Sequence, residues 1–141
     1  MFVSRKTLQA LAQGKLDDAQ LLLRNNLCSN AYYLAGYALE LGFKAAACKL
    51  FLRECLPDRD LVAKLYSSGH DLKALPGLAG LGKAFEDARA AAPDLSANWS
   101  TVSQWSVSSR YEMIDEFRAV EMVNAVGDDA HGVLAWLKKH W

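Results

Sequence analysis

One stretch of this sequence, from Asn30 to Glu54, restricts the possible folds more than any other. Across its first nineteen residues the only charged side chains are Glu40 and Lys44, and only two glycines disfavour a helix. A helix that is apolar on nearly every side is stable when other helices surround it. We therefore expect a central helix over this stretch, ended by Pro57, because helices usually stop before the residue that precedes a proline.

The rest of the composition indicates a single helical domain spanning residues 1–141. A chain of this length buries a sizeable core, and the alternation typical of strands is nearly absent. The formal net charge is zero, so no long-range field attracts nucleic acid or an anionic membrane. The N-terminus lacks the apolar core of a secretion signal, and two charges interrupt the central apolar run. We expect a cytoplasmic protein that does not bind membranes.

The predicted fold class is all-α, an up-and-down (antiparallel) helical bundle with two long helices and several short ones. Ser4 is expected to cap a short helix that Gly14 ends, and Ser29 or Asn30 to cap the central helix. Further short helices are expected at about 17–25 and 59–66, then from Leu72 with Asp71 as its cap, and at about 83–91, where Pro93 ends the helix. A Ser-rich connection over 94–109, packed down by Trp99 and Trp105, is expected to lead to a second long helix at about 113–139.

Two apolar surfaces follow from the helical period. Small residues form a stripe on the central helix, where another helix can approach closely. This stripe either packs inside the chain, against the last helix, or forms a dimer seam. The stripe consists of Ala31, Ala35, Ala38, Gly42 and Ala46, and the core-facing seam expected on the last helix consists of Met113, Phe117, Val120, Val123, Gly127, Ala130, Leu134, Leu137 and Trp141.

The first candidate site is the charged pair on the central helix. Glu40 and Lys44 are one turn apart, with the acid nearer the N-terminus, so they can form an ion pair. At 100° per residue, Tyr33 and Tyr37 lie on the same side of the helix. The pair is either a satisfied structural pair or the floor of a pocket.

Two further segments carry candidate binding residues. His70 and Asp71 follow a glycine, so the imidazole either faces a ligand or bonds to the backbone. Arg110 and Tyr111 precede the last helix, where the guanidinium can bind a phosphate or carboxylate and the ring can stack. Alternatively, Arg110 forms an ion pair with a nearby carboxylate such as Asp71.

Other kinds of site find no support in the sequence. His131 lies near Asp128 and Asn124, but a third metal ligand is not identifiable, so we expect no metal site. The sequence has three cysteines, Cys28, Cys48 and Cys55, and all lie in apolar runs. An odd number of cysteines in such runs is typical of reduced thiols in a core. The glycines after Pro76 lack the ending of a phosphate-binding loop, and neither a nucleophile elbow nor a cofactor motif is present.

Taken together, these segments resemble the HEPN family of small all-α proteins, which are related to the helical half of kanamycin nucleotidyltransferase. The resemblance covers about 17–136, nearly the whole chain. It implies an up-and-down bundle, frequently a homodimer, with a site for a nucleotide or RNA and often a nucleotidyltransferase partner. The matching residues are Tyr32, Tyr33, Glu40 and Lys44 on the second helix; Gly69, His70, Asp71 and Leu72 in the short loop; and Trp105, Arg110 and Tyr111 before the final helix.

The ribonuclease motif of many HEPN proteins, Arg followed after four to six residues by His on the last helix, is not matched. The residues at that distance before His131 are Val126, Ala125 and Asn124, and none carries a cation that would stabilise charge on a phosphate. A non-catalytic binding protein is therefore the first hypothesis.

In this first hypothesis, a nucleotide, another phosphate-bearing ligand or a nucleotidyltransferase partner binds through Lys44, His70 and Arg110, with Trp105 and Tyr111 as stacking surfaces. The second hypothesis is a toxin-like ribonuclease that combines His70 with Arg110. The third is a structural or adaptor bundle in which Glu40 pairs with Lys44 and Asp71 with Arg110. Convergence of Lys44, His70 and Arg110 on a cleft open to solvent would favour the first two. A closed network in which Glu40 and Asp71 neutralise their charges would favour the third.

Overall fold

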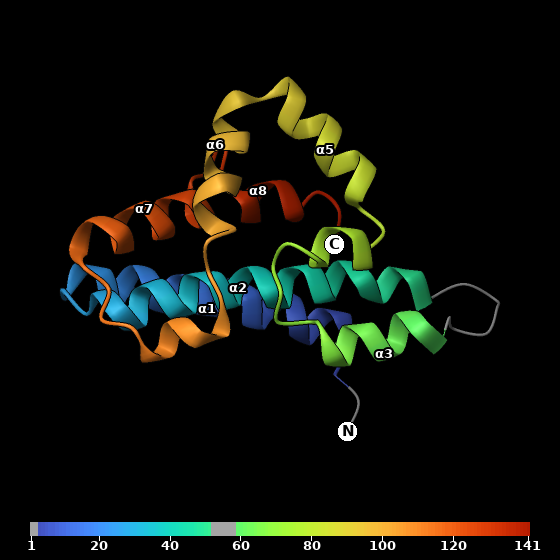
Figure 1. Ribbon diagram of the computed structural model, residues 1–141, viewed down its shortest axis with the longest axis horizontal. Coiled ribbons are helices and arrows are strands. Elements are labelled where there is room, and N and C mark those ends of the chain that lie inside the picture. The colour runs from blue at the N-terminus through green and yellow to red at the C-terminus, as the bar shows by residue number, and fades with distance from the viewer. Residues whose placement is uncertain (1–2, 52–58) are drawn as a thin grey trace.

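A computed structural model describes residues 3–51 and 59–141, and within these ranges every regular element is a helix (Figure 1). This confirms the predicted all-α bundle. The two long helices, however, are the first two rather than the second and the last. The elements are α1 (Arg5–Arg24), α2 (Cys28–Ala47), the 3₁₀ helix η1 (Cys48–Phe51), α3 (Arg59–Ser67), α4 (Leu75–Leu78), α5 (Gly82–Ala91), α6 (Pro93–Val102), the 3₁₀ helix η2 (Val107–Tyr111), α7 (Glu116–Gly127) and α8 (Val133–Leu137).

Helix α1 is continuous, so the predicted break at Gly14 is wrong. Ser4 caps the helix as expected, because its hydroxyl accepts a hydrogen bond from the Thr7 N–H at 3.0 Å. One glycine inside a helix disfavours it by only about 1 kcal/mol. The apolar face of α1 continues past Gly14, and Leu16 and Ala19 are buried against the core. The helix ends at the predicted Asn pair, where Asn26 has a φ of 60°.

Gly14 offers a direct test of this continuity. A Cβ atom at Gly14 would have no neighbouring atom within 4 Å, so alanine fits without a clash. We expect Gly14→Ala to raise the free energy of unfolding by about 0.5–1 kcal/mol, because alanine favours the helix and restricts the unfolded chain. Urea denaturation followed by circular dichroism measures this change. A loss of stability would show that α1 bends or breaks at this residue.

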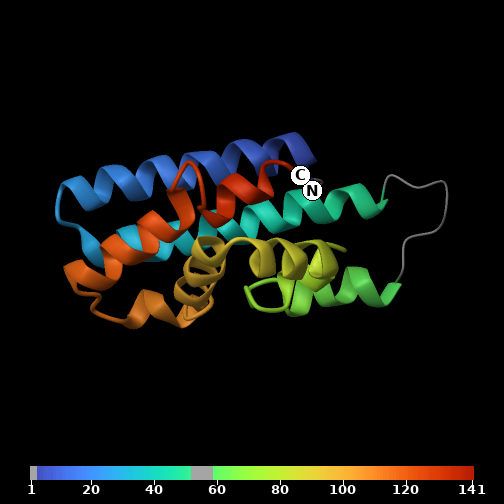
Figure 2. The ribbon, with the colours of Figure 1, turned by 90° about the horizontal axis from the view of Figure 1, so that it is seen from above.

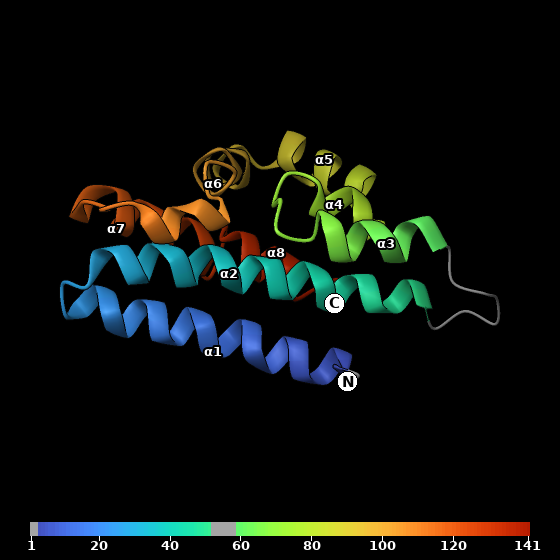
Figure 3. The same cartoon turned by 60° about the horizontal axis from the view of Figure 1, so that its bottom comes forward.

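Helix α2 is the predicted central helix, and Figures 2 and 3 show it between antiparallel α1 and the shorter helices that follow. It begins at Cys28, so neither Ser29 nor Asn30 caps it, and the Ser29 hydroxyl accepts a hydrogen bond from the Ile114 N–H at 2.9 Å. The expected helical continuation over 52–54 and the end at Pro57 fall outside the described residues, as does Cys55.

The small-residue stripe of α2 is buried inside the chain, which confirms the packing interpretation and excludes this stripe as a dimer seam. Ala31, Ala35 and Ala38 are each 0% exposed. A Cβ atom at Gly42 would lie 3.2 Å from a Leu137 methyl group and 3.3 Å from one of Leu134, so the stripe meets α8.

The predicted last helix is interrupted, and its predicted seam is only partly right. Helix α7 ends at Gly127, and the Asp128 carboxylate accepts the N–H groups of Ala130 (3.2 Å) and His131 (2.7 Å), which forms a turn before α8. The start of the predicted seam is also wrong, because α7 begins only at Glu116 and not near Met113. Val123, Leu134 and Leu137 are buried as expected, whereas Met113 and Phe117 are 98% and 70% exposed.

The expected connection over 94–109 contains a helix. Pro93 does not only close α5 but also begins α6, where its missing N–H is no loss. The two indoles pack down as predicted, since Trp105 is 4% exposed and Trp99 lies 4.8 Å from Phe85, ring centroid to centroid. Phe85 also contacts Trp136 of α8 at 4.6 Å. These ring contacts join α5 and α6 to α8, and Figure 1 shows the course of the three helices.

Over the described ranges, none of the helices combines the length and the apolar character that crossing a membrane requires.

Candidate functional site

A buried carboxylate at the middle of α2 organises the candidate site. Glu40 is 1% exposed, and its Oε1 accepts a hydrogen bond from Lys44 Nζ at 2.7 Å. The Nδ1 atom of His70 lies 2.9 Å from Oε1 and 3.0 Å from Oε2 of the same carboxylate. A buried charge is stable only when it is paired and hydrogen-bonded, and here both oxygens have partners. We call Glu40, Lys44 and His70 the Glu40 cluster.

The two partners of Glu40 come from different elements. Lys44 is one turn along α2, so helix geometry alone brings it to the carboxylate. His70 arrives on the loop between α3 and α4, which lies beside α2 in Figure 3. Gly69 allows this approach, because a Cβ atom there would lie 2.1 Å from the Leu65 carbonyl oxygen and 2.9 Å from Lys44 Cε.

The contact with Glu40 determines which nitrogen of His70 is available for chemistry. A carboxylate accepts hydrogen bonds, so Nδ1 carries the proton at this contact. In the neutral imidazole, Nε2 is then the acceptor. The His70 side chain is 57% exposed and that of Lys44 is 27% exposed, so both reach solvent while Glu40 does not. The cluster therefore presents one proton acceptor and one ammonium group at the surface.

Two half-buried tyrosines continue the same side of α2. Tyr33 and Tyr37 are stacked, with centroids 6.2 Å apart and planes 14° apart. Lys15 of α1 places its ammonium 5.9 Å from the centre of the Tyr37 ring, a cation–π contact. Burial raises the pKa of Tyr37, and the negative charge of Glu40 raises it further, so the ring and the carboxylate share one electrostatic environment. We call Tyr33, Tyr37 and Lys15 the tyrosine face.

Trp105 is a structural support of this face. Its ring lies 5.8 Å from Tyr33, and its indole covers Gly36, where a Cβ atom would lie 2.3 Å from two indole atoms. The buried indole N–H makes no hydrogen bond with the described part of the chain. Trp105 therefore supports Tyr33 on α2, and because it is 4% exposed it offers a ligand little surface for stacking.

Within the described ranges, the other predicted residues make no hydrogen bond or ion pair with the Glu40 cluster, although Asp71 adjoins His70 in the chain. Arg110 stacks over the ring of Tyr111 at 5.0 Å, and both are exposed on η2. Between residues 59 and 141, where both lie, Asp71 does not pair with Arg110. Its carboxylate accepts the Lys73 N–H at 3.0 Å. Asp71 therefore forms a turn rather than a helix cap at Leu72, since α4 begins three residues later, at Leu75.

The structure also describes the residues considered for metals and thiol chemistry. The Nε2 atom of His131 lies 3.9 Å from Oδ2 of Asp94. Within the described ranges, no three His, Cys, Asp or Glu side chains come together in a group that could hold a metal ion. Cys28 and Cys48 are free thiols in half-buried positions, and burial raises the pKa of Cys48, although the charge of Arg5 opposes this.

Lys15 is the residue of this site that sequence reasoning missed. Lys15 belongs to α1, and an expected break at Gly14 separated it from the rest of the chain. The spacing of residues on α2 carries no signal for a contact with another helix. Gly69 is part of the predicted His-containing loop, but its fit against Lys44 depends on tertiary packing.

Comparisons of the chain with models of protein families, with curated proteins and with solved structures found no match.

Proposed function

We propose that this protein is a non-catalytic binding protein whose ligand carries an aromatic ring and a phosphate group, as a nucleotide does. The observation that supports the proposal is the continuity of the tyrosine face with the Glu40 cluster along α2. Tyr33 and Tyr37 are half-buried and nearly parallel, and a base that stacks on the exposed part of one ring would gain about 1–3 kcal/mol. The proposed site shares Tyr33, Glu40, Lys44 and His70 with the residues that match the HEPN family. It uses Lys15 and Tyr37 instead of Trp105, Arg110 and Tyr111.

The charges of this surface favour an anion over a cation. Lys15 and Lys44 together outweigh the single carboxylate of Glu40, and that carboxylate is buried beneath its partners. Lys44 uses one of its three N–H donors on Glu40, which leaves two for a phosphate. Because Glu40 also holds Lys44 and His70 in place, less side-chain entropy is lost when a ligand binds.

A thermal-shift titration with ADP, adenosine and pyrophosphate tests the proposal. ADP should raise the unfolding temperature saturably, and each half of the ligand should do so only at higher concentration. A ligand at one hundred times its Kd stabilises a protein by about 2.7 kcal/mol. Lys15→Gln should weaken ADP binding about tenfold, because it removes a charged contact.

The matched control is Lys83→Gln, which changes a lysine that is 84% exposed on α5 and pairs with Asp87. This variant should bind ADP as the unchanged protein does. Equal loss in both lysine variants would indicate non-specific charge attraction and contradict the proposed site. No stabilisation by any of the three ligands would favour the structural or adaptor hypothesis.

The Glu40–His70 contact favours ribonuclease activity as a second candidate. A carboxylate that orients an imidazole leaves Nε2 free to accept a proton from a ribose hydroxyl, which is the task of a general base. Purified protein incubated with tRNA tests this activity. His70→Ala should abolish any cleavage while His131→Ala leaves it intact; cleavage retained in His70→Ala would reject this candidate.

A further inference from the structure

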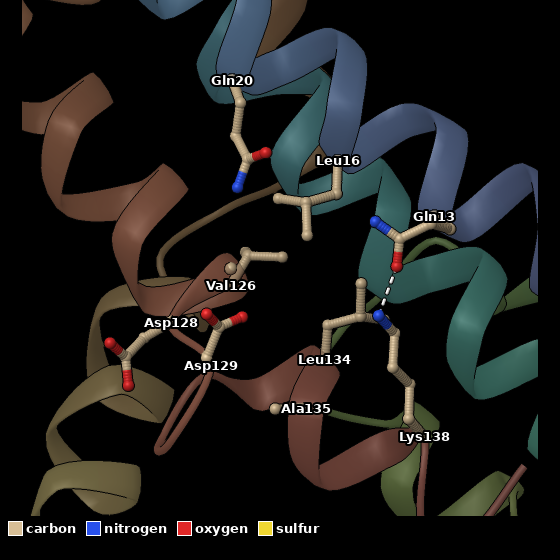
Figure 4. Close-up of a pocket in the computed structure, with 10 residues that line it drawn as sticks. Gln13, Leu16, Gln20, Val126, Asp128, Asp129, Leu134, Ala135 and Lys138 are labelled. Atoms are coloured by element: carbon tan, nitrogen blue, oxygen red, sulfur yellow. Dashed lines mark hydrogen bonds between the residues drawn. The ribbon is translucent and has the colours of Figure 1, made fainter.

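A pocket lies where α1 meets the turn between α7 and α8 (Figure 4). Its volume is about 380 Å³, enough for a small molecule. The pocket exists because two elements separate here. Helix α7 approaches α1 closely at Gly127, where a Cβ atom would lie 3.0 Å from Leu16 and 3.1 Å from Gln20, and the chain then turns away at Asp128.

The open surface of this pocket is mainly polar, and its edges carry opposite charges. Leu16, Val126 and Leu134 form part of the lining. Figure 4 shows the carboxylate of Asp129 and the ammonium group of Lys138 on different sides of the pocket, with Leu134 between them. The sequence-based prediction of one continuous last helix does not indicate this pocket, because a continuous helix lacks the turn that places Asp129 at its edge.

The polar groups at the edges have unused hydrogen-bonding capacity. Asp128 is occupied by the N–H groups of its own turn, whereas the carboxylate of Asp129 makes no hydrogen bond or ion pair with residues 3–51 or 59–141. The side-chain amide of Gln20 is similarly without a partner in those ranges. Lys138 Nζ donates a hydrogen bond to Oε1 of the Gln13 side chain and retains two further N–H donors.

We propose that this pocket binds a small zwitterion of the amino-acid class, with its ammonium group at Asp129 and its carboxylate at Lys138. Separated charges of opposite sign select for a ligand that carries both, and Leu134 between them offers a small apolar contact to a short hydrocarbon chain. The Gln20 amide can accept from the ammonium group or donate to the carboxylate. This site is independent of the Glu40 cluster and of any nucleotide.

An NMR titration of ¹⁵N-labelled protein with γ-aminobutyrate, butylamine and butyrate tests this site. The zwitterion should shift the amide signals of residues 126–138 and of the facing turns of α1 saturably. Butylamine and butyrate each keep one charged contact, so each should bind about tenfold more weakly than γ-aminobutyrate. Saturable binding in the millimolar range is expected for a ligand of this size.

Variants assign the two ends of the ligand. Asp129→Asn should weaken γ-aminobutyrate but leave butyrate unchanged, and Lys138→Gln should weaken γ-aminobutyrate but leave butylamine unchanged. Asp18→Asn changes an exposed carboxylate of α1 outside the pocket and is the matched control. Butylamine binding as tightly as γ-aminobutyrate, shifts outside the pocket, or no saturable shift with any probe would each overturn the proposal.

Discussion

Replacing Gly36 by alanine should destabilise the protein by about 2–3 kcal/mol, although the same substitution usually stabilises a helix. A Cβ atom at Gly36 would lie 2.3 Å from two atoms of the Trp105 indole, and this rigid ring is 4% exposed. The ring is buried and packs against Tyr33, so the helix and the ring must move apart to make room for the methyl group. Chemical denaturation measures the loss, which outweighs the gain of about 1 kcal/mol in helix propensity.

A double-mutant cycle identifies the indole as the cause. Trp105→Leu alone should lower the free energy of unfolding by about 3 kcal/mol, because a large buried side chain is lost. In that background Gly36→Ala should be neutral or stabilising, because the clash is gone. An equal loss in both backgrounds would assign the effect of Gly36 to something other than the contact with Trp105.

Removing the ammonium group of Lys44 should lower the free energy of unfolding more than removing the Glu40 carboxylate with which it pairs. Lys44→Met leaves the carboxylate of Glu40 buried with only His70 as a partner. Loss of one partner of a buried charge is strongly destabilising, and we expect about 2–3 kcal/mol because one contact remains. Glu40→Met removes the buried charge itself, and both former partners reach solvent, so about 1 kcal/mol is expected.

Urea denaturation of four variants measures this asymmetry. The double variant Glu40→Met with Lys44→Met should recover most of the stability that Lys44→Met loses, because no buried charge remains. Lys83→Met, in the exposed pair with Asp87, is the control and should change stability by less than about 0.5 kcal/mol. If Glu40→Met proves the more destabilising single change, the carboxylate is not the group that needs pairing.

Local patterns predicted the central helix and its charged pair well. The apolar run after Asn30 identifies the buried helix, the spacing of Glu40 and Lys44 predicts their contact, and the hydroxyl of Ser4 predicts its cap. Each of these depends on residues within one or two turns of each other. The same is true of the small-residue stripe, which is buried as its side-chain sizes indicate.

Breaks between helices were predicted less well, because glycine, proline and aspartate act differently in different surroundings. Gly14 is tolerated inside α1 because burial along the apolar face outweighs its poor propensity. Pro93 begins a helix as readily as it ends one. The turn at Asp128 depends on a side-chain hydrogen bond that a helical period does not reveal.

The candidate site is partly local and partly tertiary. The contact of Glu40 with Lys44 follows from helix geometry, whereas only the HEPN resemblance placed His70 in the same site as Glu40. The meeting of Lys15 with Tyr37 depends on how α1 and α2 are aligned, and the separation of Arg110 from the cluster depends on where η2 packs. Such contacts between elements carry no signal in one sequence.

An NMR titration of ¹⁵N-labelled protein with ADP tests the central claim most directly. The account predicts saturable changes in the amide signals of Tyr33, Tyr37, Lys44 and His70, and the loss of these changes in Lys15→Gln but not in Lys83→Gln. A spectrum unchanged by ADP, or changes confined to the pocket between α1 and the turn at Asp128, would contradict it.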